Sequence, residues 1–447
     1  MIFKQRTRKV FVKMTVGTER QKQMGTRIPL WLIVFSMIIA MVFVSPYEYS
    51  WSLFTAPIGK LLGISPTAAV VSTTFSIYIV VQALTMFFSG RYLDKRRHLT
   101  PYFVVIAGFL TSIGWILSSF TSKSTGIYYL YATYGIGSLG PGIVYGVGIS
   151  TALKWFHGKT RGLAVGLIDL GFGAGSFAVS PLVEYIIKNY NFHAAFLYVG
   201  LLMLVIIPFG FLVRYPPADY VPPGKTAAEA EVVRKRVKKS GLEDNPRQMV
   251  SRWQFWSIYI GFFFVAGAYL GIIGKLTSIG TTVTGIAISG FIAVYVFPLS
   301  NGIGRFVSGV VSDFIGRREA MLLFFGIAGI GLLVLFSMKS ELAFVVVIMI
   351  IAFCSGPLFT LWPSMVGDYF GEQKSGGNYG LVYTAKAVAG LFAGYGFAVY
   401  YTAYGVHSSL LLTGVMMIIA AIIGYSTVVP KVKQHLQASK AVPPSNQ

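Results

Sequence analysis

Residues 89–97 read SGRYLDKRR, and residues 308–318 read SGVVSDFIGRR. Both segments contain Ser-Gly, then an Asp four residues after the Gly, then a pair of Arg residues. A second correspondence, at a similar offset along the chain, joins KWFHGKTRGLAVGL at residues 154–167 with DYFGEQKSGGNYGL at residues 368–381. Matches of this kind in separate loops indicate an internal repeat. Repeated halves are typical of secondary transporters, whose substrate sites lie between the repeats.

Each half of the repeat contains six apolar stretches. Hydrophobic residues make up 55% of the 447-residue chain and charged residues only 12%, whereas about a quarter of a soluble domain is charged. Each stretch is long enough to cross a hydrocarbon core of about 30 Å as a helix. In such a core only helices or closed barrels satisfy the backbone. The predicted helices lie at about residues 28–62, 66–90, 100–120, 126–153, 162–187 and 194–213, and then at 253–275, 285–311, 320–338, 342–366, 376–402 and 407–429. The sequence therefore predicts an all-α integral membrane protein with twelve transmembrane helices in two pseudo-symmetric six-helix bundles.

This pattern divides the chain into five parts. We expect a cytoplasmic tail at residues 1–27, because this basic segment is followed by an apolar run much longer than a signal-peptide core. One bundle follows at 28–213 and the other at 253–429. A Pro-rich and charged cytoplasmic linker is predicted between them at 214–252, and a cytoplasmic tail at 430–447.

The basic residues are distributed unevenly across the predicted membrane. The formal net charge is +22. Of the 37 Lys and Arg residues, 30 fall in the tails and in the loops after helices 2, 4, 6, 8 and 10. This positive-inside distribution predicts a multi-pass protein of the cell membrane with both termini in the cytoplasm. The charge is thus topological, and it favours contact with anionic lipids over nucleic acid.

Two cations remain inside predicted spans, Arg305 and Lys386. Each costs about 2.5 to 3.5 kcal/mol near the membrane midplane unless something offsets it. An anion is one such offset, because an Arg offers a planar fork to a carboxylate and a Lys a movable point charge. A buried structural ion pair is the alternative. Asn301 lies one turn before Arg305 and is placed either to orient it or to contact substrate.

Across nearly its whole length the chain resembles the major facilitator superfamily. The family's loop pattern, G-x-L-A-D-x-x-G-R-R, is close in the segment after helix 8 and looser after helix 2, where Arg96 stands in place of the expected Gly. Gly allows close helix approach, and the carboxylate can hold a neighbouring helix end on the cytoplasmic side until the halves rock apart. A plain surface charge cluster is the alternative. The predicted cytoplasmic gate comprises Gly90, Asp94, Arg97, Gly309, Asp313, Arg317 and Arg318.

Within that superfamily, finer motifs resemble the oxalate/formate antiporter family and the related monocarboxylate transporters. They include YSWSLFTAPIG, NGIGRFVSGVVSD, LWPSMVGDYFG and YTAKAVAG. The resemblance implies that Arg305 and Lys386 together bind the substrate carboxylate inside an aromatic cage. One or more of Tyr47, Tyr49 and Trp51 is implied from helix 1. The other candidates for this cage are Tyr78, Gln82, Tyr145, Trp362 and Tyr383. Packing is the alternative role for each aromatic residue.

Two acids lie in the same predicted spans, Glu48 in helix 1 and Asp169 in helix 5. Intramembrane acids commonly face cavities and serve as ion partners or proton carriers. If both ionise, they cancel the two cations, and an anion would then enter only together with protons. They could equally be structural partners of Arg305 and Lys386. The sequence thus leans toward proton-coupled, lactate- or pyruvate-like monocarboxylate transport, with oxalate/formate-type antiport as the alternative.

Other chemistry finds no support in the sequence. There is no HExxH, Walker loop or CxxC motif, and glycine strings such as GFGAG fall in predicted membrane helices, where Gly serves close packing. We therefore expect neither an enzyme nor a metal or cofactor site. The expected partners are a small carboxylate anion, protons and membrane lipids, with no nucleic acid, and the expected state is a monomer.

Overall fold

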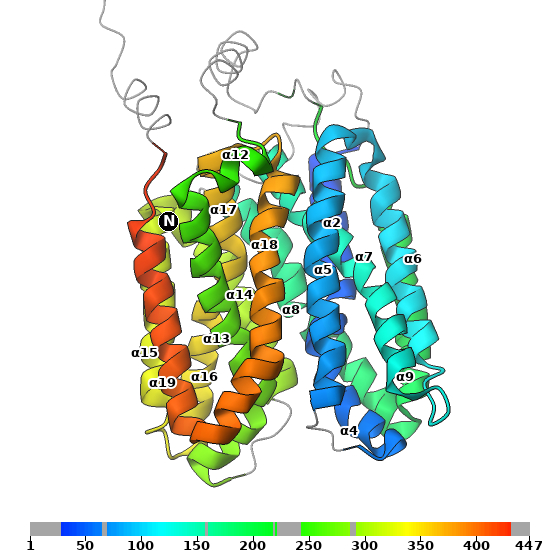
Figure 1. Ribbon diagram of the computed structural model, residues 1–447. Helices are drawn as coiled ribbons and strands as arrows, with labels where there is room; N and C mark the ends of the chain where they lie inside the picture. Colours follow the sequence, from blue (N-terminus) through cyan, green and yellow to red (C-terminus); the bar gives the residue numbers. More distant parts are fainter. Residues whose placement is uncertain are drawn as a thin grey trace, which may run out of the picture.

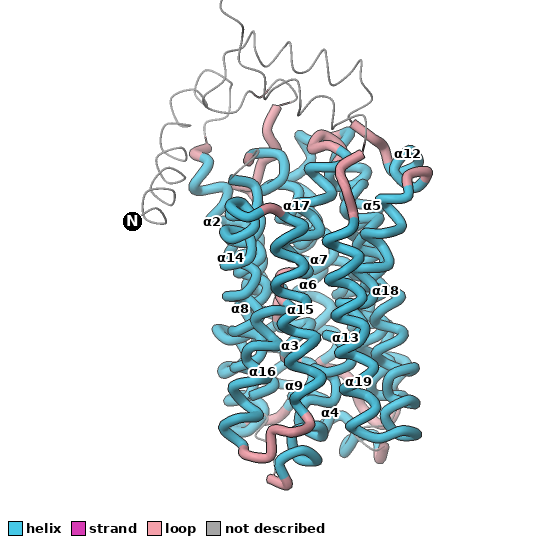
Figure 2. The backbone as a smooth tube through the Cα atoms, turned by 90° about the vertical axis from the view of Figure 1, so that its left-hand side faces the viewer, coloured by secondary structure: helices cyan, strands magenta, loops and turns pink. Residues whose placement is uncertain are grey.

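The computed structural model describes residues 28–64, 69–156, 160–217, 220, 243–286 and 292–430. Helices and their connections account for all of these described residues (Figure 2). The predicted tail at 1–27, most of the linker, and the tail after residue 430 lie outside the described part. The helices run roughly parallel to one another in two groups that face each other (Figure 1).

The first half contains six crossings. The first is built from three pieces, α2, α3 and α4, and the sixth is built from α9, a 3₁₀ turn η3, and α10. The elements are α2 Leu30–Val44, α3 Pro46–Tyr49, α4 Trp51–Leu62, α5 Ala69–Lys95, η1 Arg97–Leu99, α6 Thr100–Ser118, α7 Gly126–Trp155, α8 Arg161–Asn189, α9 Phe192–Leu202, η3 Met203–Val205 and α10 Ile206–Gly210.

The second half follows the short helix α12, Pro246–Val250. Two π-helical segments, η4 and η5, extend the crossings that contain α14 and α18. The elements are α13 Trp253–Thr284, η4 Ile292–Val296, α14 Phe297–Ile315, α15 Arg317–Leu335, α16 Glu341–Ser355, α17 Leu358–Phe370, α18 Ser375–Leu391, η5 Phe392–Gly396 and α19 Phe397–Ser426.

Twelve crossings follow from these elements. Ten helical stretches in the described residues are long and apolar enough to span a membrane. One of them, Ser375–Ser426, is interrupted at Gly405, whose φ of 75° and ψ of −179° reverse the chain, so it forms two crossings. A glycine suits this position because other residues avoid positive φ. The helix α14 supplies the remaining crossing, and the predicted all-α fold of twelve helices in two bundles is confirmed.

The outer face of the bundle is apolar. Large side chains that point outward include Phe88, 65% exposed, Tyr128, 80% exposed, and Leu342, 76% exposed. Exposed apolar surface of this extent marks a surface that contacts something other than water. Together with the helix lengths, it places the described helices in a lipid bilayer as a multi-pass membrane protein.

The two halves meet along α8 against α14 and along α5 against α18, which lie at the centre of the view in Figure 1. Glycines permit these contacts. A Cβ atom on Gly302 would lie 2.5 Å from the backbone nitrogen of Ala174, and one on Gly90 would lie 2.5 Å from the carbonyl oxygen of Gly376. Small residues of this kind allow membrane helices to approach closely. These two seams carry Arg305 on α14 and Lys386 on α18 to the interface between the halves.

Candidate functional site

Arg305 and Lys386 both lie fully buried where the two halves meet, each with no exposed side-chain surface. Arg305 projects from α14 toward α8, and Lys386 projects from α18 toward the first crossing and α5. Burial of an ionised group is unfavourable unless it is paired and hydrogen-bonded. The partners of each cation therefore define what the site can do.

Every nitrogen of the Arg305 guanidinium donates a hydrogen bond. Nη1 donates to Oδ1 of Asp169 at 2.9 Å, and Nη2 donates to the hydroxyl of Tyr49 at 2.9 Å. Nε donates to Oδ1 of Asn301 at 3.0 Å, one turn earlier on the same helix. Tyr49 in turn accepts a hydrogen bond from Tyr269 at 2.9 Å. The guanidinium is thus held by three separate acceptors in a fixed orientation.

Lys386 is held in a second network. Its ammonium donates to Oε2 of Glu48 at 2.6 Å, to the hydroxyl of Tyr383 at 3.1 Å and to Oε1 of Gln82 at 3.2 Å. The Tyr78 hydroxyl donates to the same oxygen of Glu48 at 3.2 Å and accepts from Nε2 of Gln82 at 2.8 Å. One carboxylate and two neutral acceptors therefore share the ammonium.

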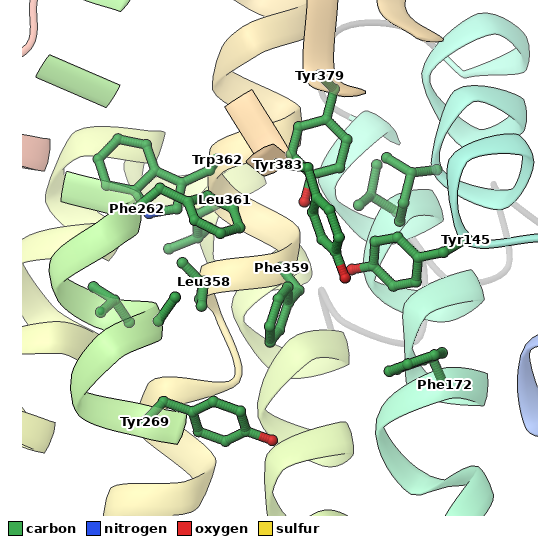
Figure 3. Close-up of a cluster of buried hydrophobic side chains, with 14 of the residues drawn as sticks. Tyr145, Phe172, Phe262, Tyr269, Leu358, Phe359, Leu361, Trp362, Tyr379 and Tyr383 are labelled. Atoms are coloured by element: carbon green, nitrogen blue, oxygen red, sulfur yellow. The ribbon is translucent and has the colours of Figure 1, made fainter. Parts of the chain in front are cut away.

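Aromatic rings link the two networks. The ring centroid of Phe359 lies 4.3 Å from Cζ of Arg305 and 5.2 Å from Nζ of Lys386. Phe172 lies 5.6 Å and 5.9 Å from the same two atoms. Because both cations lie near the same Phe359 ring, they are neighbours at the interface between the halves. Figure 3 shows Phe172 and Phe359 beside Tyr145 and Tyr383. The ring centroids of Tyr145 and Tyr383 are 5.0 Å apart.

The formal charges of the four groups cancel. Both cations come from the second half, whereas Glu48 and Asp169 come from the first, and each acid is paired with one cation. The structure therefore contains the two buried ion pairs that the sequence left as one of two alternatives. The two members of each pair depend on each other, because removing one of them leaves the other as an uncompensated buried charge. Oε1 of Glu48 and Oδ2 of Asp169 receive no hydrogen bond of ordinary geometry from the described residues.

Most, but not all, of the sequence-predicted cage residues gather at these cations. Tyr78, Gln82 and Tyr383 belong to the Lys386 network, and Asn301 to that of Arg305. Tyr145 packs against the rings of Phe172 and Tyr383.

Two tryptophans predicted for the cage lie elsewhere among the described contacts. Trp362 stacks on Phe325 inside the second half and contacts the backbone at Gly261. In Figure 3 it lies on the side away from Tyr145. Trp51 packs against Tyr134 within the first half. The large apolar area of Trp is buried in packing here, and the residue of helix 1 that reaches Arg305 is Tyr49.

Sequence reasoning missed three residues that shape the site. Tyr269 on α13 had no distinguishing signal, because it lies in a long aromatic-rich helix. Phe359 lies three residues before Trp362 on α17, just outside the motif LWPSMVGDYFG. Phe172 was visible as the counterpart of Lys386 in the repeat, but nothing marked it as a shared neighbour of both cations.

At one end of the bundle, Asp94 joins α5 to the start of α18. Its carboxylate accepts the backbone N–H of Gly376 at 3.2 Å and of Gly377 at 2.7 Å. It also pairs at 2.8 Å with Lys154 of α7, whose ammonium donates to Ser375 at 2.7 Å. A carboxylate at a helix N-terminus satisfies unpaired backbone donors and the positive end of the helix dipole.

The corresponding residue of the second half makes the same contact with the other bundle. Asp313 accepts the backbone N–H of Gly162 at 3.1 Å and of Leu163 at 2.9 Å, at the start of α8. Arg317 pairs with Asp313 at 2.6 Å and with Asp368 at 3.3 Å. The two halves thus exchange equivalent carboxylate-to-helix contacts across this end of the molecule.

The remaining predicted gate residues divide into two groups. Gly90 and Gly309 lie at close backbone contacts between the halves, and Arg97 donates to the carbonyl oxygen of Pro216 at 3.2 Å and to Gln373 of the second half. Arg318, by contrast, lies on Tyr425 within its own half. The sequence did not single out Arg161, which is buried and pairs with Asp368 and Glu372 across the interface.

No group of three or more potential metal ligands occurs among the residues that the structure describes. The groups at the centre are two paired cations, two acids, amides and phenols. Such a set can bind an anion and can exchange a proton.

Comparisons with known proteins agree with the fold. A family model described as Major Facilitator Superfamily matches residues 30–299 and 276–445. The chain is 32% identical over 394 residues to the oxalate:formate antiporter of Oxalobacter formigenes, covering 87% of this chain and 89% of that one. It is 37% identical over 111 residues to monocarboxylate transporter 9 of Gallus gallus, covering 25% of this chain and 21% of that one. Among solved structures, the proton:xylose symporter XylE is similar with a TM-score of 0.70 at 13% identity, covering 88% of this chain and 94% of that one.

Proposed function

The chain belongs to the major facilitator superfamily, and from this premise we propose that it is a secondary active transporter of small organic carboxylates that works by alternating access. The observation that carries the proposal is the pair of buried cations at the interface between the halves, linked by shared aromatic neighbours. A site between the repeats, reached in turn from either side, is how such folds move a solute. The superfamily comprises transporters, not enzymes.

Arg305 and Lys386 are the proposed carboxylate ligands. The guanidinium can present two parallel N–H donors to a carboxylate, and the ammonium can follow the anion as a point charge. For the anion to bind, at least one of the contacts with Asp169 and Glu48 must be exchanged for a contact with substrate. Tyr383, Gln82 and Tyr49, which contact the cations in the structure, can then hydrogen-bond the anion or the released acids.

Proton coupling is the mode we propose for this exchange. With both acids ionised, the four central groups carry no net charge, so an added monoanion would bring an excess negative charge into a low-dielectric site. Protonation of one acid removes that excess. Binding of one monocarboxylate with one proton therefore leaves the site as neutral as it was. Lactate- or pyruvate-like anions fit this scheme.

Carboxylate exchange is the second candidate mode. Its support is the oxalate:formate antiporter of Oxalobacter formigenes, which is 32% identical over most of both chains. Two cations close to the same rings suit a small dianion, provided that both acids are displaced or neutralised.

Proteoliposome uptake tests the function and the mode together. We expect labelled lactate or oxalate to accumulate in vesicles that contain the protein, and uptake of the true substrate to fall to background in Arg305→Gln/Lys386→Gln. If transport is coupled to protons, uptake should rise when the solution outside the vesicles is more acidic than the solution inside. Uptake indifferent to the gradient would favour exchange, and undiminished uptake by the double variant would refute the carboxylate site. The variant Lys339→Gln, whose side chain lies on Phe336, is the matched control.

The orientation follows from the charge distribution. We propose that both termini and the linker are cytoplasmic and that the basic loops contact anionic lipids, because Lys and Arg accumulate in these segments. The Asp94 and Asp313 contacts then form the cytoplasmic gate, which must break as the halves rock. A monomer can perform this cycle, because the site lies between the two halves of one chain.

A further inference from the structure

Glu48 and Asp169 occupy different situations, although each is a buried acid paired with a cation. We propose that Glu48 takes up the coupling proton, whereas Asp169 stays ionised and acts as a positioning residue for Arg305. This inference rests on the proposed function, and it assigns separate roles to two acids that the charge count alone treats as equivalent.

Lys386 can release Glu48 without losing all of its partners. The ammonium also donates to the Tyr383 hydroxyl at 3.1 Å and to the amide oxygen of Gln82 at 3.2 Å. These neutral acceptors remain in place when Glu48 is protonated. A protonated Glu48 becomes a hydrogen-bond donor, and the Tyr78 hydroxyl, 3.2 Å from Oε2, can turn from donor to acceptor. Each group in this network therefore retains a partner in both protonation states.

Arg305 differs from Lys386 in its rigid planar geometry rather than in the number of its neutral acceptors. Its three nitrogens are each committed to a different acceptor, and Asp169 is the anionic one among them. A guanidinium cannot lose its proton in a protein. Protonation of Asp169 would therefore leave a permanent buried cation whose remaining acceptors, Asn301 and Tyr49, are neutral. This asymmetry, between an ammonium that can turn toward its remaining acceptors and a rigid guanidinium with a permanent charge, assigns the proton to Glu48.

The helix is also interrupted beside Glu48 but continuous around Asp169. Asp169 lies in the middle of α8, a helix of 29 residues. Glu48 lies on α3, a four-residue helix that begins at Pro46, between the longer helices α2 and α4. Its amide donates to the carbonyl of Ser45, three residues back, at 3.0 Å. Because Pro lacks an amide hydrogen, the first crossing is interrupted at this point, which allows a local adjustment of Glu48 that the continuous α8 does not.

The charged and titratable groups that face Glu48 are consistent with a proton site. Lys386 on α18 is the one cation in direct contact with it among the described residues. The other facing groups are phenols, from α5, α7, α13, α18 and α3 itself, and phenols stay neutral near pH 7. They are Tyr78, Tyr134, Tyr269, Tyr383 and Tyr49. Lys386 is therefore the charged neighbour that a proton on Glu48 would release.

The resulting cycle balances in charge and protons. A proton from water on one side joins the Glu48 carboxylate, and the ammonium of Lys386 is freed to contact the substrate carboxylate beside Arg305. After the halves rock, the anion leaves, the proton passes from Glu48 to water on the other side, and Lys386 pairs with Glu48 again. One proton accompanies each monoanion, so the transport step moves no net charge.

The experiment compares Glu48→Gln with Asp169→Asn in proteoliposomes. Two rates are measured with the carboxylate that the wild type accumulates: uptake driven by an inward pH gradient, and exchange of labelled for unlabelled substrate at equal pH. Glu48→Gln should abolish gradient-driven accumulation and flatten the pH profile of KM, while exchange persists within about tenfold, because Gln82 and Tyr383 still hold Lys386. Asp169→Asn should reduce both rates by more than about tenfold, because Arg305 loses its anionic partner. Glu341→Gln, at an exposed helix start, is the unaffected control.

Glu48→Asp is the control for misfolding at this position. It keeps a carboxylate, so it should retain the gradient-driven uptake that Glu48→Gln lacks. Gradient-driven accumulation by Glu48→Gln, or persistent exchange without pH dependence in Asp169→Asn, would overturn the assignment. Wild-type protein that accumulates a carboxylate without any pH dependence would also overturn it while leaving carboxylate transport intact. Absence of carboxylate uptake by the wild type would instead refute the proposed function.

Discussion

Arg305 and Lys386 show how differently two cations can be used at one site. The guanidinium has a fixed geometry and donates to three partners at 2.9 to 3.0 Å. The ammonium is a point charge whose three acceptors include two neutral ones. Both lie near the rings of Phe172 and Phe359, and we propose that they form one site. The fixed cation can set the orientation of an anion, and the adaptable one can respond to its arrival.

Arg305→Lys keeps the positive charge but removes the planar fork. A single ammonium cannot reach Asn301, Asp169 and Tyr49 at once, so at least one buried acceptor loses its partner. We expect KM for carboxylate uptake to rise by more than about tenfold, since Arg and Lys are not interchangeable at such sites. Arg247→Lys on α12, outside the helical bundle, serves as the control. Unchanged KM in Arg305→Lys would show that the fork geometry is not used.

At the scale of the elements, helix ends and helix seams carry the contacts between the halves. Asp94 holds the start of α18, and Asp313 holds the start of α8. The two contacts are related by the internal repeat but differ in their cations. Lys154, paired with Asp94, has a side chain only 2% exposed, whereas Arg317, paired with Asp313, is 11% exposed and also contacts Asp368.

This difference predicts unequal effects of Asp94→Asn and Asp313→Asn. Asp94→Asn leaves Lys154 buried without its acid, so we expect a loss of about 1–3 kcal/mol in the free energy of unfolding. Asp313→Asn should cost less, because Arg317 retains Asp368. Thermal unfolding measures the stability, and hydrogen exchange over residues 375–382 should be faster in Asp94→Asn. Equal effects of the two substitutions would contradict this account of the gate.

The twelve-helix architecture could be predicted from the sequence because it depends on local signals. Apolar length, the placement of basic residues and the repeated loop each report on one segment at a time. The partners at the centre could not be predicted in the same way. Pairing Arg305 with Asp169, and Lys386 with Glu48, depends on how helices of opposite halves are rotated against one another. Composition and spacing do not determine that rotation.

The aromatic residues illustrate the same limit. Tyr78 and Tyr383 were candidates for the cage, and the structure places Tyr383 at Lys386 and Tyr78 at the paired acid Glu48. Trp362 and Trp51 were predicted by the same reasoning, yet they pack within their own halves. A large ring near a site serves packing as readily as binding, and only its direction from the helix distinguishes the two. Tyr49, two residues before Trp51, points toward Arg305 instead.

At the scale of the whole molecule, the central groups connect the two bundles through charge. Each acid of the first half is paired with a cation of the second half. In the proposed mechanism, an anion that binds at the cations replaces at least one of these contacts and so changes what holds the halves together at the centre. The proposed mechanism thereby couples substrate binding to the rocking of the bundles.

Ligand-induced stabilisation of the purified protein tests the carboxylate site most directly. Thermal unfolding would be followed across a panel of mono- and dicarboxylates, with the wild type and with Arg305→Gln/Lys386→Gln. A ligand at about 100 times its Kd should stabilise the folded wild type by about 2.7 kcal/mol. We predict such a shift with at least one small carboxylate, and no shift in the double variant, which should still unfold cooperatively. An equal shift in the double variant, or no shift of the wild type with any carboxylate, would contradict the account.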